Sequence, residues 1–152
     1  MTGTGTVEGV FVTPESGDEL HARDEVEALA GQGLRGDRYF DEADEGSAGF
    51  DLTLIELEAV EAAEREGGLS LAPGEHRRNV ETRGIALNHL VGERFRVGEV
   101  VCRGVELCEP CAHLQRLTQD GVLQSLVHRG GLCAEIVEGG VIRPGDTVER
   151  LA

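Results

Sequence analysis

Short stretches of alternating apolar and polar residues, separated by glycine-rich turns, predict a chain built mainly from β-strands. The first strand passes through Val7, Gly9 and Phe11 and ends at Thr13-Pro14. Further strands are predicted within 95–107, at 132–136, at 141–143, and after the Pro-Gly-Asp turn at 144–146. Residues 20–30 fit a strand or a helix, and the Gly- and Asp-rich stretch 31–50 predicts a long ordered loop.

Two segments carry a helical pattern instead. Thr53 followed by Glu56 has the spacing of a capping box, and an apolar stripe continues to Gly67-Gly68, which predicts the helix end. A second helix is predicted near 114–128. We therefore expect a mainly β fold, a closed or partly closed β-barrel of short, mostly antiparallel strands with two or three peripheral helices. The length predicts a single domain over residues 1–152.

The charge composition excludes some classes of function. The formal net charge is −15 and all 14 cationic residues are Arg, with no Lys. Such a surface repels phosphate backbones, which argues against nucleic-acid binding, and it is typical of proteins from a salt-rich cytoplasm. Without Lys the chain cannot form the Schiff base of covalent pyridoxal-phosphate chemistry.

Neither a membrane span nor a secretory leader is indicated by the sequence. No apolar run approaches the roughly 18–20 residues of a transmembrane helix, and the start MTGTGTVEGV lacks a basic or an apolar leader segment. We therefore expect a cytoplasmic protein whose four cysteines are free thiols or ligands rather than a disulfide framework.

Two polar motifs are candidates for ligand contacts. In GLRGDRYF (33–40) the glycines are suited to a close approach of a ligand, or the motif is a turn with a local ion pair. In HRRNVETRGI (76–85) two Arg and an Asn could bind an anion, or the Arg residues pair with surface carboxylates. A third motif, Arg129-Gly130-Gly131, could cradle an anion or simply end a helix.

The cysteines leave several chemistries open. Cys108 and Cys111, with His113 nearby, have the residue types of a zinc site, but such a site usually takes four ligands. Cys102 and Cys133 lie inside strand patterns and are predicted as small core residues. A thioredoxin-like pair lacks its usual strand–CxxC–helix context. A loop thiol after a strand also suits a nucleophile or a soft ligand to a transition metal.

The order of the motifs resembles the MOSC family, which is named for the C-terminal domain of molybdenum-cofactor sulfurases. The resemblance runs from about residue 5 to 150, through GLRGDRYF, DLTLIELEAVE, RRNVETRGIALNHLVGERFRVGEVV, CEPCAHL, HRGGLCAEI and GGVIRPGD. It implies a β-barrel and a reactive, catalytic cysteine at Cys111, which in the amidoxime- and hydroxylamine-reducing branch ligates molybdenum. It further implies cofactor contacts from Arg78, Asn79 and Arg77, in a pocket shared with Asp37, Arg38, His113, Arg129 and Gly131.

The resemblance leads to one main hypothesis and two alternatives. The first is an oxidoreductase that holds the molybdenum cofactor (molybdopterin) and reduces N-hydroxylated compounds with electrons from a separate donor protein, since the chain has no ferredoxin-type cysteine set. The second is a sulfur-transfer or cofactor-binding module with a persulfide on Cys111, served by a sulfur donor. The third is a zinc-stabilised binding domain.

Overall fold

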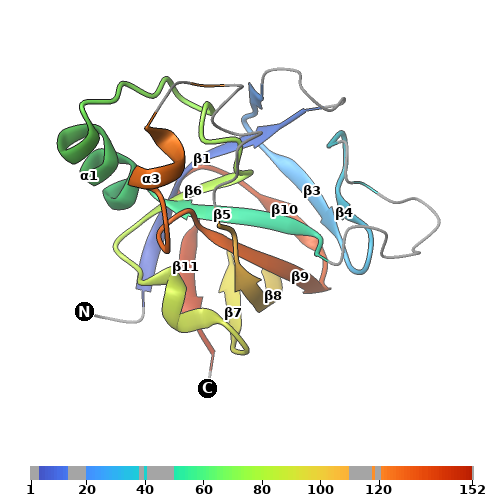
Figure 1. Ribbon diagram of the computed structural model, residues 1–152. Helices are drawn as coiled ribbons and strands as arrows, with labels where there is room; N and C mark the ends of the chain where they lie inside the picture. The colour runs from blue at the N-terminus through green and yellow to red at the C-terminus, as the bar shows by residue number, and fades with distance from the viewer. Residues whose placement is uncertain are drawn as a thin grey trace.

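The fold is a closed barrel of seven strands (Figure 1). The computed structural model describes residues 4–13, 20–37, 40, 50–109, 118 and 121–151. In barrel order the strands are β1 (Thr4–Val12), β11 (Thr147–Arg150), β7 (Arg94–Val97), β8 (Val100–Leu107), β9 (Leu132–Glu138), β5 (Leu52–Glu56) and β6 (Val80–Arg83). The ring closes because β1 pairs with both β6 and β11. The described barrel pairs are antiparallel except β5–β6, so the predicted mainly β barrel is confirmed.

Four short strands lie outside the ring. β2 (His21–Ala22) pairs with β1, while β10 (Gly140–Ile142), β3 (Val26–Leu29) and β4 (Gly33–Leu34) form a separate three-stranded sheet. The segment 20–30 is therefore strand and not helix. Within the predicted loop 31–50 the structure describes β4 and its turns, and residues 38–39 and 41–49 lie outside the described residues.

A bulge in β1 decides which of its side chains enter the barrel. The register with β6 shifts between Val7 and Gly9, so Val7, Val10 and Val12 all join the main core although their spacing is uneven. Phe11 then points to the outside of the barrel wall, where its ring meets His76 edge-on at a centroid distance of 5.8 Å. Strict alternation through Val7, Gly9 and Phe11 would have placed Phe11 with Val7.

The predicted start of the first helix is wrong. Leu52, Leu54 and Ile55 are fully buried in a strand that pairs with β6 on one edge and β9 on the other. A strand covered on both faces is a continuous apolar run, which periodicity alone cannot distinguish from a helix start. The helix α1 begins only at Leu57 (Leu57–Gly67), and its predicted end is confirmed because Gly68 adopts a left-handed φ of 65°.

Helical structure is sparser than predicted. Besides α1, the described residues contain a 3₁₀ turn, η1 (Leu87–Leu90), and the single helical turn α3 (Val122–Ser125). The helix predicted near 114–128 is thus helical over 122–125, and residues 114–117 and 119–120 lie outside the described residues. α1 and α3 lie side by side against the barrel (Figure 1), around a small apolar cluster that includes Ala63, Val122 and Leu126. None of the helices in the described chain has the length and apolar character needed to cross a membrane.

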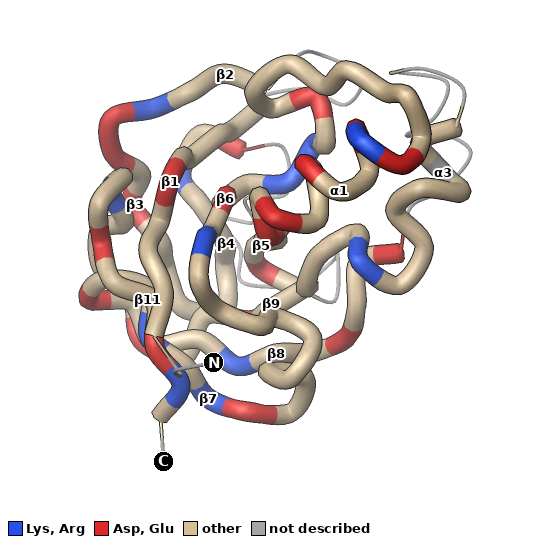
Figure 2. The backbone as a smooth tube through the Cα atoms, turned by 90° about the vertical axis from the view of Figure 1, so that its left-hand side faces the viewer, with Lys and Arg blue, Asp and Glu red and all other residues tan. Residues whose placement is uncertain are grey.

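Many surface arginines pair with carboxylates. Figure 2 shows acidic positions spread along the chain, with basic positions interspersed among them. Arg83 Nη2 lies 2.8 Å from Glu61 Oε2, and Arg35 Nε lies 2.8 Å from Glu27 Oε1. The hydrogen bond from Arg83 holds the pKa of the Glu61 carboxyl below its ordinary value. Exposed pairs of this kind are screened by water and contribute little to the stability of the fold.

Candidate functional site

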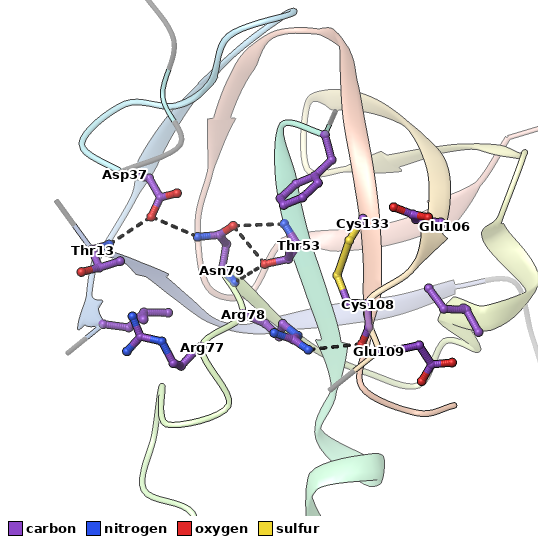
Figure 3. A pocket seen from close by; sticks show the side chains of 13 residues that line it. Thr13, Asp37, Thr53, Arg77, Arg78, Asn79, Glu106, Cys108, Glu109 and Cys133 are labelled. Carbon is purple, nitrogen blue, oxygen red and sulfur yellow. Dashed lines mark hydrogen bonds between the residues drawn. A yellow bond between two sulfur atoms is a disulfide. The ribbon is translucent and has the colours of Figure 1, made fainter. Parts of the chain in front are cut away.

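A cavity of about 270 Å³ opens at the end of the barrel where β1 and β8 end and β6 begins (Figure 3). Its wall comes from segments far apart in the sequence, because a barrel brings the ends of non-consecutive strands to one rim. The lining residues are Thr13, Leu20, Asp37, Phe50, Thr53, Arg77, Arg78, Asn79, Glu106, Leu107, Cys108, Glu109 and Cys133. The cavity therefore brings the RRN motif next to the end of β8 and to Cys108, which follows that strand.

Asn79 lines this cavity just before β6, and its side chain links the two strands on either side of β6. Its Oδ1 accepts hydrogen bonds from the backbone N–H of Thr53 (3.0 Å) and from Thr53 Oγ1 (3.1 Å). Its Nδ2 donates to the Phe11 carbonyl (3.1 Å) and to Asp37 Oδ1 (3.4 Å). Asp37 in turn accepts from the Thr13 N–H at 3.0 Å. The buried Asn79 amide thus joins β1 and β5 at the point where β6 starts between them.

Arg77 and Arg78 stand on the loop just before β6. Arg77 adopts a left-handed φ of 64°, uncommon outside glycine. Arg78 Nε donates to the Gly130 carbonyl at 2.7 Å, and its Nη2 donates to the Cys108 carbonyl at 3.2 Å. These bonds fix the half-buried Arg78 guanidinium between the β6 loop and the two segments that carry Gly130 and Cys108. A guanidinium held this way is a preorganised partner for phosphate or carboxylate.

A buried His–Glu pair supports the arginine loop. His76 is 1% exposed, and its Nδ1 accepts the backbone N–H of Arg78 at 2.9 Å. The ring proton therefore lies on Nε2, which donates to Glu81 Oε2 at 2.7 Å. No sequence pattern marks this pair, because a loop residue and a strand residue five positions on share no period. The pair holds the loop in place through the Arg78 backbone, while Arg77 and Arg78 line the cavity.

Two of the cysteines form a disulfide in the cavity wall, which corrects the expectation of free thiols or ligands. Cys108 and Cys133 are bonded with a Cα–Cα distance of 5.5 Å, and both line the cavity. Cys133 is buried within β9, as predicted, and the register of β9 against β8 places it on the same face as Cys108. The buried Cys102 is a free thiol in the core, as predicted, and desolvation there raises its pKa to about 12.

Glu109 joins the cavity rim to the turn after α3. Its carboxylate accepts the His128 backbone N–H at 2.7 Å and lies 2.8 Å from His128 Nδ1. The backbone hydrogen bond, followed by that of the ring, holds the pKa of Glu109 below its ordinary value. His128 itself has a left-handed φ of 63°, and its carbonyl accepts from Asn88 Nδ2 at 2.8 Å. Sequence reasoning gave neither Glu109 nor His128 a role.

The remaining predicted site residues fall in different places. Arg129 lies outside the described cavity lining, since its guanidinium bonds the Ser125 carbonyl (2.7 Å) and Glu66. Gly131 also lies outside the lining, and a Cβ there would collide with the Leu54 carbonyl oxygen, so this glycine allows two strands to approach closely. Cys111, His113 and Arg38 lie outside the described residues. Within the described part of the chain, no three His, Cys, Asp or Glu residues form a group that could hold a metal.

The described chain is a small mixed β-barrel of seven strands with an arginine-bearing cavity at one rim. The model of the MOSC domain matches residues 41–149, and the chain therefore belongs to the MOSC domain family. No curated protein matches the chain by sequence.

Solved structures share this fold at low sequence identity. The YuaD protein from Bacillus subtilis has a TM-score of 0.81 at 17% identity, over 97% of this chain and 95% of that chain. YiiM from Escherichia coli has a TM-score of 0.69 at 20% identity, over 97% and 70% of the two chains. YiiM from Geobacillus stearothermophilus has a TM-score of 0.69 at 13% identity, over 99% and 75%. Likeness at these identities shows the fold alone.

Proposed function

We propose that this protein binds the molybdenum cofactor in the barrel-rim cavity and is a reductase of N-hydroxylated compounds. One observation carries the proposal. In a chain of net charge −15, two consecutive arginines line the same cavity, and Arg78 is held by backbone carbonyls. Membership of the MOSC domain family supports the molybdenum cofactor as the anionic ligand. Arg77 and Arg78 would hold its phosphate.

The described residues fit such a ligand. A volume of about 270 Å³ lies just below the usual range of small-molecule sites, which is about 300–1,000 Å³. The guanidinium of Arg78 is already ordered by its two carbonyl contacts, so ligand binding costs less side-chain entropy. Asn79, expected as a cofactor contact, makes four side-chain hydrogen bonds within the barrel. Its proposed role is therefore to shape the cavity floor.

Cys111 is the proposed metal ligand, since a thiolate is a soft donor suited to molybdenum. It follows Cys108 by three residues, and Cys108 is held through both its N–H, which donates to the Gly131 carbonyl at 2.8 Å, and its carbonyl. When bound, the metal supplies two-electron chemistry that removes oxygen from nitrogen. The residues that line the cavity would hold the cofactor and set the room left for substrate. A separate donor would supply the electrons.

Elemental analysis of protein from a host that makes the molybdenum cofactor tests the proposal. We expect about one molybdenum per chain, lost in Cys111→Ala and kept in Cys102→Ala, a matched change of a cysteine buried in the core. We also expect Arg78→Met to lower molybdenum content at least tenfold, whereas Arg96→Met, which removes an exposed ion pair, leaves it unchanged.

Two other results would contradict the proposal. Sulfane sulfur on Cys111 without metal would assign the chain to sulfur transfer. Stoichiometric zinc that disappears with Cys108→Ala would assign it to a zinc-stabilised binding domain.

A further inference from the structure

The Cys108–Cys133 disulfide lies in the wall of the same cavity as the arginines. Figure 3 shows its sulfur–sulfur bond among the cavity side chains, and both cysteines line the cavity. The side chains are otherwise well covered, at 7% and 6% exposure. A cystine kept only for stability has no need to border a ligand site, and this one does.

The free cysteine Cys102 lies in a different environment from the disulfide pair. Cys102, on the strand β8 that ends just before Cys108, is fully buried in the main core, and burial raises the pKa of its thiol to about 12. Cys108 has the Arg78 guanidinium against its own carbonyl, at 3.2 Å. Among the described cysteines, Cys108 and Cys133 border the cavity and Cys102 does not, so this pair lies where a dithiol that enters the cavity can exchange with it.

A metal-binding role for the pair has no support in the described residues, where no third His, Cys, Asp or Glu completes a ligand group. What two thiols can do without a third ligand is store two electrons. They release those electrons, with two protons, when they close to a disulfide.

We propose that Cys108 and Cys133 are a redox-active pair that delivers two electrons to the reaction in the cavity and is recharged by an external dithiol reductant. The inference rests on the proposed function for the identity of the electron acceptor. For an N-hydroxylated substrate the balance is R–NHOH plus two thiols giving R–NH₂, water and one disulfide. The N–O bond breaks, the S–S bond forms, and the two thiol hydrogens end on nitrogen and oxygen. Exchange with the external dithiol then restores both thiols and leaves that reductant as its disulfide.

The first experiment measures the pair itself in cofactor-free protein. The folded protein is equilibrated in dithiothreitol buffers of graded potential, alkylated and counted by mass spectrometry, while circular dichroism follows the fold. We expect Cys108 and Cys133 to gain label together while the dichroism stays native, and Cys102 to stay unlabelled until denaturant is added. A disulfide that opens only with the loss of native dichroism would overturn the proposal and leave a structural bond.

The second experiment asks whether the electrons reach substrate. Cofactor-loaded protein is reduced, freed of reductant and mixed with a hydroxylamine compound. We expect one equivalent of amine for each new Cys108–Cys133 disulfide. In Cys133→Ala, turnover driven by dithiothreitol should fall at least tenfold relative to turnover driven by reduced viologen in the same variant, while Cys102→Ala keeps the wild-type ratio.

The outcomes separate the two claims. Turnover with viologen but no disulfide formation in the wild-type protein would overturn the relay and leave the proposed function intact. No turnover with either donor, while the pair still titrates in the folded protein, would overturn the proposed function and with it the assigned acceptor. Because the wild-type protein gives both readouts, a Cys133→Ala chain that fails to fold does not remove the test.

Discussion

Replacing Asn79 by Asp changes one atom of the side chain that links β1 and β5 at the start of β6. Asn79 is 6% exposed, and its Nδ2 donates to the Phe11 carbonyl (3.1 Å) and to Asp37 Oδ1 (3.4 Å). In Asn79→Asp an oxygen faces both acceptors, and a second carboxylate lies beside Asp37. The contacts from Thr53 to Oδ1 remain possible. The substitution therefore tests the donor side of the network without removing volume.

The expected loss of stability follows from the contacts. A buried carbonyl deprived of its donor costs about 1–3 kcal/mol. A new buried charge beside a like charge adds to this, and its cost is reduced by the Thr53 donors, so we expect a total of about 3–5 kcal/mol at neutral pH. Burial and the like charge raise the pKa of the new carboxyl. The loss is therefore smallest below its ordinary pKa and grows as the pH rises through the raised folded-state value.

Urea unfolding followed by circular dichroism measures the effect, since the chain has no Trp. The control is Asn88→Asp, because the exposed Asn88 also donates from Nδ2 to a single carbonyl, that of His128 at 2.8 Å. We expect the control to lose no more than about 0.5–1 kcal/mol. An Asn79→Asp protein as stable as the control, or one that gains nothing at about pH 5 over pH 8, would refute the role assigned to Asn79.

Three further predictions concern the surrounding frame. Gly131→Ala combines a φ of 115° with a collision against the neighbouring strand, so urea unfolding should show a loss of about 3 kcal/mol or more. The control Gly36→Ala, where φ is 93° and the space is open, should lose about 1–2 kcal/mol. Glu81→Gln should cost under about 1 kcal/mol because its amide oxygen still accepts the His76 Nε2–H, whereas His76→Leu should cost about 2–4; equal losses would contradict the assigned tautomer. Glu109→Gln should lower stability at pH 7 but not at a pH below the depressed pKa of Glu109. A carboxylate with a lowered pKa stabilises the fold above its ordinary pKa, and this contribution disappears as the pH falls through the folded-state pKa. Thermal unfolding at both pH values measures the difference.

The sequence predicted the features that depend on local chemistry. Gly68 could be recognised as a helix end because a left-handed residue there is favoured by glycine. Arg77 and Arg78 could be recognised because paired arginines are unusual in so acidic a chain. The barrel class followed from many short strands, each of which needs partners on both edges.

The features that depend on register were beyond the sequence. Thr53 looked like a helix cap, but it lies in a strand and bonds Asn79, a partner 26 residues away. The disulfide between Cys108 and Cys133 depends on how β8 and β9 align, and spacing along the chain does not determine a pairing. His76 and Glu81 meet because a loop folds back on a strand, which leaves no periodic signal.

An anomalous-difference map at the molybdenum absorption edge, from crystals of protein produced with the cofactor, tests the central claim most directly. We expect a molybdenum peak in the cavity lined by Arg78, Cys108 and Cys133, with density for the cofactor's phosphate at the guanidinium of Arg78. A peak elsewhere on the molecule, or an empty cavity in crystals whose protein contains stoichiometric molybdenum, would contradict it.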